Sequence, residues 1–389
     1  MKVLFITDDP GISTGVASVS RNIVENPPSD LHFSVVGCNV KDTSSQIPNF
    51  GVVQRFSNYG TYNWLINHVR NNDYDTCMVM GDPHLFGHVY KASPFIRSKM
   101  PLVYYHVWDS SHPAPTFNKP VYDCFDHIMC ASNETFLGVQ KSGRQSGFKL
   151  VPHGVNLDVY NPENASRMSE NIKFFQHPRF EDQNVILFAG TNQKRKNIAQ
   201  IIEVFSKCEY VDDSQLVIKT DPGGYYNVPR IASYYDVLDR VSMYSQTVDR
   251  NSMAGVYGNA DVLINIPHRE GFGLVPLEAA ACGVPSIVSF AGGQKDQKTK
   301  LHYNILTSHS HVECDPSGTL VRETFVETNS AVPLLNHLLL NPGSVSNNVH
   351  NQIKELNMDA RSMRKTIYDL LRNQAENYGG IDSFFIDTV

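Results

Sequence analysis

Two series of short apolar runs, each alternating with amphipathic stretches, constrain the fold of this chain more than any other feature. The runs fall at residues 2–7, 32–36, 76–80, 102–107 and 127–131, and again at 185–189, 215–219, 262–266 and 285–289. Continuous apolar runs are typical of strands that are buried on both faces of a sheet, and strand–helix alternation favours parallel pairing with right-handed crossovers. The sequence therefore predicts an α/β protein with two doubly wound, Rossmann-like domains that face a central cleft.

A stretch with little periodicity separates the two series. It lies between Asn156 and Gln183 and contains Asn161-Pro162 and His177-Pro178, which are typical of turns. A last helical pattern follows the second series near the end of the chain. The expected parts are a first domain at residues 1–165, a second domain at 166–357, and a C-terminal helix and tail at 358–389.

Composition excludes several classes of protein. Hydrophobic residues make up 41% and charged residues 19% of the 389, so wholesale disorder is excluded. A net charge of −6 argues against a dedicated nucleic-acid binder. The apolar runs are too short for a transmembrane segment, and the seven cysteines show no C-x-x-C spacing. We expect a soluble cytoplasmic protein with reduced thiols, without a transmembrane segment, for which peripheral contact with a membrane stays open.

One region inside the second domain is expected to be irregular. It covers residues 292–318 and contains His302, His309 and His311. No cysteine or carboxylate pattern accompanies these histidines, so we interpret the region as a surface loop and expect no metal site in the chain.

The segment from Asp261 to Pro285 carries the most specific pattern. It reads as a strand, a tight glycine turn, a short helix and the next strand. Gly271 and Gly273 leave backbone N–H groups uncovered at a helix N-terminus, which suits a phosphate. Glu270 lies in the turn and Glu278 about two helical turns later. Two carboxylates placed in this way could hold the hydroxyls of two different sugars.

Three cations begin the helix after the strand at residues 185–189. They are Lys194, Arg195 and Lys196, and their charge opposes the dipole at a helix start. A bound anion explains them better than solvent does. In the first domain, a glycine-containing loop with Gly15 opens a helix, and the strand at 102–107 ends near His106.

Together these segments resemble family-4 retaining glycosyltransferases, which have the two-Rossmann GT-B fold. Residues 270–278 match the E-x7-E signature, 151–156 are similar to the turn at the end of the family's first domain, and 188–197 are similar to its donor-phosphate loop. The resemblance spans roughly residues 1–380. It implies that the last helix crosses back onto the first domain.

The resemblance assigns roles to individual residues. Lys196 would bind the donor diphosphate, while Thr191 stands where the family has an arginine, a departure for which we hypothesise that Arg195 compensates. Gly15 would approach the donor phosphates and the acceptor, and His106 the donor sugar. The catalytic residues expected on this basis are Glu270, His106 and Lys196.

The glycine turn and its helix would hold the rest of the donor. Glu270 would bind the donor sugar and Glu278 the ribose, and the family's front-face mechanism requires no metal. The donor-binding residues expected on this basis are Gly15, Thr191, Arg195, Lys196, Gly271, Phe272, Gly273, Leu274 and Glu278.

The implied reaction moves a hexose from a nucleotide-diphosphate sugar to a hydroxyl of a glycan, a glycoconjugate or a small-molecule acceptor. Donor candidates are GDP- and UDP-hexoses such as GDP-mannose or UDP-glucose, with no other cofactor. Backbone near residues 241–245 would select the base, and loops around 109–119 the acceptor. Two alternatives stay open: a nucleotide-sugar epimerase, and a non-catalytic protein that binds nucleotide sugars or glycans, which the departure at Thr191 favours.

Overall fold

A computed structural model describes residues 1–41, 47–109, 115–297, 301–305, 307–314, 320–341 and 349–380. Contacts divide the chain into two compact units. Unit 1 comprises Met1–Gly154 together with Ala360–Val389, and unit 2 comprises Val155–Asp359. Residues 110–114, in the segment expected to select the acceptor, lie outside the described residues.

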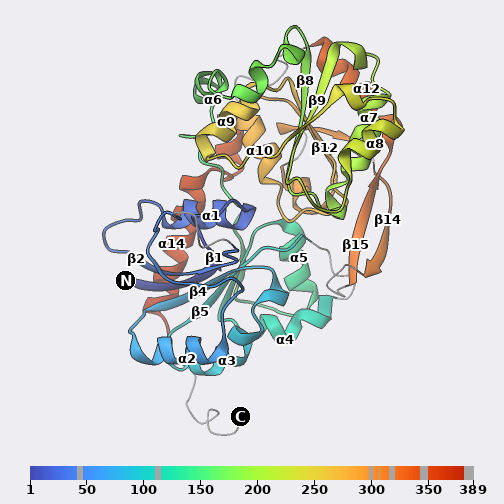
Figure 1. Cartoon of the computed structure of the whole chain (residues 1–389). Coiled ribbons are helices and arrows are strands. Elements are labelled where there is room, and N and C mark those ends of the chain that lie inside the picture. The colour runs from blue at the N-terminus through green and yellow to red at the C-terminus, as the bar shows by residue number, and fades with distance from the viewer. Residues whose placement is uncertain are drawn as a thin grey trace. The chain divides into compact units, whose positions relative to one another are not determined.

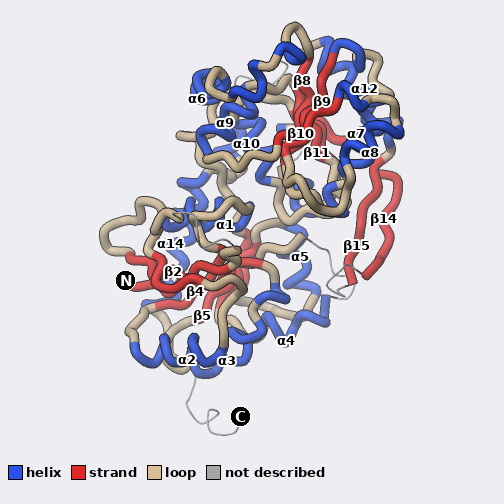
Figure 2. Tube along the Cα trace, in the orientation of Figure 1, coloured by secondary structure: helices blue, strands red, loops and turns tan. Residues whose placement is uncertain are grey.

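Unit 1 is built on a seven-stranded parallel sheet, which confirms the predicted architecture for the first half of the chain (Figures 1 and 2). Its strands lie in the order β3-β2-β1-β4-β5-β6-β7. The central strands β4 and β5 are buried along their whole length because helices cover both faces, as their unbroken apolar runs predict. The strands are β1 (Lys2–Asp8), β2 (His32–Cys38), β3 (Val52–Arg55), β4 (Thr76–Gly81), β5 (Leu102–His106), β6 (His127–Cys130) and β7 (Phe148–Leu150).

Helices cover the two faces of this sheet in two groups. One group buries its apolar side chains against Leu4 and Ile6, and the other includes the C-terminal helix. The first group contains α2 (Tyr62–Asn71), α3 (Gly87–Arg97), α4 (Lys119–Tyr122) and α5 (Asn133–Lys141), and the second contains α1 (Gly15–Val24) and α14 (Ala360–Glu376). Arg364 and Tyr368 of α14 donate hydrogen bonds to backbone carbonyls at the end of α1. The last long helix of the chain thus packs on unit 1 (Figure 1).

Unit 2 repeats the design with a six-stranded parallel sheet in the order β10-β9-β8-β11-β12-β13. Its strands are β8 (Asn184–Ala189), β9 (Ser214–Lys219), β10 (Val241–Tyr244), β11 (Val262–Asn265), β12 (Ser286–Ser289) and β13 (Tyr303–Ile305). Its helices are α6 (Pro162–Ser169), α7 (Ile198–Ser206), α8 (Val228–Tyr234), α9 (Arg250–Gly258), α10 (Leu274–Ala281), α12 (Thr328–Leu340) and α13 (Val349–Glu355). Among the described residues, no helix is long and apolar enough to cross a membrane.

The region expected to be irregular is more ordered than predicted. It contributes β13 and the first strand of an antiparallel hairpin formed by β14 (Thr307–Cys314) and β15 (Leu320–Val326) (Figure 1). The prediction was wrong here because β14 has an exposed face with polar residues and lacks the apolar run that marks the buried strands.

Each sheet has one topological switch point, which lies between two neighbouring strands. From these two strands the chain adds further strands in opposite directions along the sheet. In unit 1 it lies between β1 and β4, and in unit 2 between β8 and β11. Ligands of open α/β sheets bind outside the carboxyl ends of the strands at such points. The loops that follow β8 and β11 are therefore the first place to look for a site in unit 2.

Candidate active site

An ion pair joins the two loops at the switch point of unit 2. Lys196, after β8, places Nζ 2.5 Å from Oε2 of Glu270, after β11. Both side chains are largely buried, with exposed fractions of 9% for Lys196 and 13% for Glu270. Because an unpaired charge is costly in such surroundings, the pair fixes both side chains at the carboxyl edge of the sheet.

Backbone contacts hold this pair in place. The N–H of His268 donates to the carbonyl of Arg195 at 2.8 Å, and Asn197 Nδ2 donates to the carbonyl of Ile266 at 3.2 Å. Asn197 has a left-handed backbone with a φ of 59°, a conformation that asparagine tolerates better than most residues. The two loops are thus joined before any ligand binds.

Arg195 lies beside the pair, whereas Thr191 is exposed. Arg195 Nη1 is 3.5 Å from Glu270 Oε2 and 3.2 Å from the carbonyl of Arg269. Thr191 is exposed, and its carbonyl accepts from the N–H of Gln193. Two cationic groups therefore meet at Glu270, at positions 195 and 196 of the loop.

The glycine turn after Glu270 presents backbone donors at the start of α10. The N–H groups of Gly271, Gly273 and Leu274 donate to no other residue in the described part of the chain. Gly273 has a φ of 92°, which favours glycine, and its backbone is packed against Gln294 and Gln297. Phe272 between them is buried. N–H groups at a helix N-terminus bind anions, so the turn can receive a phosphate next to the two cations.

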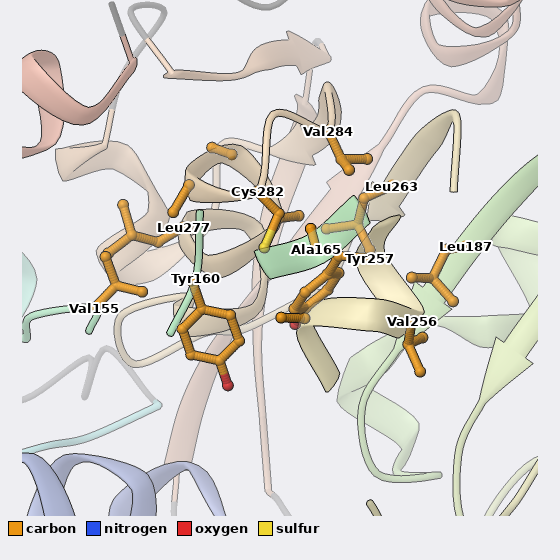
Figure 3. Packing of buried hydrophobic residues seen from close by; sticks show 14 of the residues in the cluster. Val155, Tyr160, Ala165, Leu187, Val256, Tyr257, Leu263, Leu277, Cys282 and Val284 are labelled. Atoms are coloured by element: carbon orange, nitrogen blue, oxygen red, sulfur yellow. The ribbon is translucent and has the colours of Figure 1, made fainter. Parts of the chain in front are cut away.

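Glu278 lies on the second turn of α10 and is buried. Its Oε2 accepts from the hydroxyl of Tyr257 at 2.8 Å, and Tyr160 is a second hydrogen-bonding partner. Both tyrosines belong to a hydrophobic cluster that also contains Leu277 (Figure 3). Burial raises the pKa of Glu278 to about 7, although the tyrosine hydroxyls lower it. The sequence did not single out either tyrosine, because no motif marks them.

Gly15 and His106 are parts of unit 1. Gly15 begins α1, directly after Thr14, which caps the helix by accepting from the N–H of Ala17. His106, the last residue of β5, is fully buried and stacks on Tyr104, and its Nε2 is 3.0 Å from the hydroxyl of Tyr122.

Burial determines the charge state of His106. It lowers the pKa of the ring to about 3, so the imidazole is neutral at neutral pH. Its Nδ1 has no hydrogen-bonding partner in the described part of the chain.

His302, His309 and His311, the three histidines of the region at residues 292–318, do not behave alike. His302 is buried, with 4% exposed, so the expectation of a surface loop is wrong for this residue, whereas His311 is exposed. The side chain of His309 lies outside the described residues.

The hairpin brings carboxylates to His311 that the sequence spacing did not indicate. His311, Glu313 and Glu323 place potential ligand atoms within 4.8 Å of one another. Lys194 Nζ, however, is 2.7 Å from Glu313 and 3.9 Å from Glu323, and Arg269 Nε is 3.5 Å from Glu323. Since both carboxylates already pair with cations, we assign no metal to this cluster.

A segment of unit 2 matches a known protein family. Residues 169–308 match the family described as Glycosyl transferases group 1. A D-inositol 3-phosphate glycosyltransferase from Xylanimonas cellulosilytica is 31% identical over 149 residues, which is 37% of this chain and 35% of the relative. An N-acetyl-alpha-D-glucosaminyl L-malate synthase from Bacillus anthracis is 26% identical over 113 residues, or 29% of each chain. The chain thus spans about a third of the length of these curated relatives.

Solved structures resemble the chain over nearly its full length. Anabaena Alr3699/HepE in complex with UDP and glucose has a TM-score of 0.74 at 16% identity, covering 96% of this chain and 100% of that one. Sucrose-phosphate synthase from Thermosynechococcus elongatus has a TM-score of 0.71 at 15% identity, covering 96% and 98%. The chain therefore has the GT-B fold, and residues 169–308 within it resemble group 1 glycosyl transferases in sequence.

Proposed function

We propose that this protein is a retaining glycosyltransferase of family 4 that moves a hexose from a nucleotide-diphosphate sugar to an acceptor hydroxyl. The observation that carries the proposal is the Lys196–Glu270 pair beside the N–H groups of the glycine turn at the switch point of unit 2. Positive charge and backbone donors in one place suit a diphosphate, and the neighbouring carboxylate suits sugar hydroxyls.

The leaving diphosphate is the group that this site would stabilise. In the proposed reaction, Lys196 and Arg195 neutralise the charge that develops on the phosphate oxygens, and the N–H groups of Gly271, Gly273 and Leu274 donate to them. The family's front-face mechanism lets the leaving oxygen take the acceptor proton. Because two cations and several donors would carry out this stabilisation, we propose that the reaction requires no metal.

Two carboxylates would position the donor. Glu270 accepts from the sugar hydroxyls while Lys196 and Arg195 hold it in place. Glu278 is proposed to bind the ribose, with Tyr257 orienting its carboxylate. Gly15 and His106 would contribute from unit 1, at the loop after β1 and the end of β5.

The comparisons support a choice of donor and acceptor, and the cysteines support a location. Complexes of Alr3699/HepE contain UDP-glucose, or UDP and glucose, and two relatives are named for the glycosylation of inositol phosphate and malate. We propose a GDP- or UDP-hexose as donor and a hydroxyl on a glycan, a glycoconjugate or a small molecule as acceptor. The scattered spacing of the seven cysteines, without a C-x-x-C pair, fits reduced thiols and supports a cytoplasmic location.

The test is a transfer assay with UDP-glucose and GDP-mannose over a panel of hydroxyl acceptors, in the presence and absence of EDTA. The proposal predicts product in EDTA with the anomeric configuration of the donor, determined by proton NMR, and loss of product in Glu270→Gln. Inversion of the anomeric centre, or an activity that only Mn²⁺ or Mg²⁺ restores, would contradict it.

Non-catalytic binding of nucleotide sugars is the second candidate, and the exposed Thr191 at the family's arginine position favours it. Binding of a nucleotide sugar without transfer or slow hydrolysis would support this alternative.

A further inference from the structure

A buried glutamine lies directly behind the glycine turn. Gln297 Nε2 donates to the carbonyls of Phe272 and Gly273, both at 2.8 Å, and its side chain is fully buried. It belongs to the segment after β12 that the sequence leaves without a motif. One amide group thus holds two successive peptide groups of the turn.

These two bonds determine where the N–H groups of the turn point. In a planar trans peptide, the carbonyl and the following N–H point in opposite directions. The carbonyls of Phe272 and Gly273 point to Gln297, so the N–H groups of Gly273 and Leu274 point away from it. The same geometry applies to the peptide between Glu270 and Gly271. The N–H of Gly293 donates to the carbonyl of Glu270 at 2.9 Å, so the N–H of Gly271 points away from Gly293.

A histidine holds the glutamine in this orientation. Gln297 uses both amide hydrogens on carbonyls, so its oxygen must face His302 Nε2, which lies 2.7 Å away. An amide oxygen can only accept, and the Nε2 atom of His302 therefore carries the proton. If the amide rotated by 180°, its oxygen would face two carbonyl oxygens and its NH₂ group would face an N–H donor.

We infer that Gln297, oriented by His302, is a positioning residue for the diphosphate of the nucleotide sugar. It fixes the N–H groups of Gly273 and Leu274 in the direction that binds phosphate oxygens before the ligand arrives, so that binding needs no rotation of these peptides. The inference rests on the proposed function and extends it to two residues outside the motifs.

The chain offers a matched control for a test of this role. Gln294, in the segment Gly292–Asp296, is also buried and also packs against Gly273, but its amide donates to Asn265 Oδ1 at 2.7 Å and makes no hydrogen bond to the glycine turn among the described residues. Gln297→Met and Gln294→Met each replace a buried amide with an apolar side chain of similar size, in the same region of the chain. His302→Phe leaves the Gln297 amide in place and removes only its orientation, while His302→Gln keeps an N–H donor.

The experiment measures binding of UDP, GDP, uridine and guanosine to the full chain by calorimetry and ligand-observed NMR, after thermal denaturation has shown that each variant folds. The charge-assisted bonds from the turn predict that Gln297→Met weakens binding of the nucleoside diphosphate about 10- to 100-fold and leaves the nucleoside within about twofold. We expect a loss of about tenfold in His302→Phe, a smaller loss in His302→Gln, and almost none in Gln294→Met.

Three results would overturn the inference. They are an equal loss for the nucleoside and its diphosphate, an equal effect of Gln294→Met, and unchanged diphosphate binding in both Gln297→Met and His302→Phe. If Gln297→Met does not fold, the comparison of His302→Phe with His302→Gln decides the test alone. If the unmodified protein binds neither UDP nor GDP, the proposed function itself fails, and the inference fails with it.

Discussion

The switch points of the two sheets share a topology and differ in charge. In unit 1, Asp8 is the last residue of β1 and Asp9 follows it directly, and both carboxylates are buried. Asp8 accepts from the hydroxyls of Thr14 and Tyr59, and Asp9 pairs with Arg55 at 2.7 Å. In unit 2 the equivalent place carries Lys196 and Arg195 around a single carboxylate, that of Glu270.

This difference shows how one fold can provide two kinds of site. The strand order places a loop at the same edge of each sheet, and the residues of that loop determine what can bind there. Buried carboxylates repel an anion, whereas two cations and the N–H groups at the start of α10 attract it. We therefore place the diphosphate in unit 2, an assignment that substitutions in both units can test.

Lys196→Ala should have the largest effect. It removes the cation nearest Glu270, so we expect kcat for transfer to fall about 10²–10³-fold, the range found when one preorganised donor to a developing negative charge is lost. Steady-state kinetics at saturating donor measures it. Lys207→Ala, which breaks only an exposed pair with Glu203 on α7, is the control and should leave kcat unchanged. A kcat for Lys196→Ala within about threefold of the unmodified protein would contradict the assignment.

Arg55→Ala should break the charge pair of unit 1 without affecting the donor site. Asp9 has no exposed side-chain surface, so its carboxylate would be left with the N–H of Gly11 as a donor. We expect the free energy of unfolding to fall by about 2–3 kcal/mol, because removal of one partner leaves a buried charge. Denaturant titration measures it. Nucleotide binding reduced as strongly as in Lys196→Ala would show that the two switch points do not have separate roles.

Glu278→Gln should change the pH dependence of stability. Burial raises the pKa of Glu278 from its ordinary value of 4.5 to about 7, so the folded state disfavours the charged form. This cost is absent below pH 4.5, grows as the pH rises, and is complete above pH 7. Relative to the unmodified protein, Glu278→Gln should therefore gain about 2–3 kcal/mol between pH 5 and pH 8. Denaturation at both pH values tests this, and a difference that does not depend on pH would refute it.

Arg195→Ala should raise the KM for the donor by about tenfold, since one charge-assisted contact to the diphosphate is lost. Arg230→Ala, an exposed arginine of α8, is the matched control. If both variants have the same KM, then Arg195 does not compensate for Thr191. Lys196 would then be the cation on which diphosphate binding in unit 2 depends.

Arg372→Ala should have the smallest effect. The pair between Arg372 of α14 and Asp30 is 2.9 Å long but largely solvated, so its loss should lower the free energy of unfolding only slightly and leave donor binding unchanged. A loss as large as that expected for Arg55→Ala would mean that α14 depends on this surface pair more than on its buried contacts.

Much of the fold could be predicted because the central strands are continuous apolar runs. Strands β1, β4 and β8 lie within a residue or two of the expected positions, since burial on both faces leaves a clear pattern. Strands such as β3 and β7 were not predicted, because they are short and only partly buried at the edges of the sheet. The β14–β15 hairpin was missed because β14 is polar and lacks the apolar run that marks the buried strands.

The site could be predicted only where a motif marks it. Glu270 and Lys196 are 74 residues apart, and their contact follows from the sheet order rather than from any spacing. Gln297 and His302 carry no motif and lie in a segment that appears irregular. A buried polar residue leaves no periodic signal, so its partners can be identified only in the folded structure.

The most direct test of the central claim is a thermal-shift panel of UDP-, GDP-, ADP- and TDP-sugars on the unmodified protein and Lys196→Ala, with and without EDTA. The account predicts that one nucleotide series raises Tm, that the rise survives EDTA, and that it is lost in Lys196→Ala. If no nucleotide sugar raises Tm, or if the rise persists unchanged in Lys196→Ala, unit 2 does not hold the donor diphosphate at its switch point.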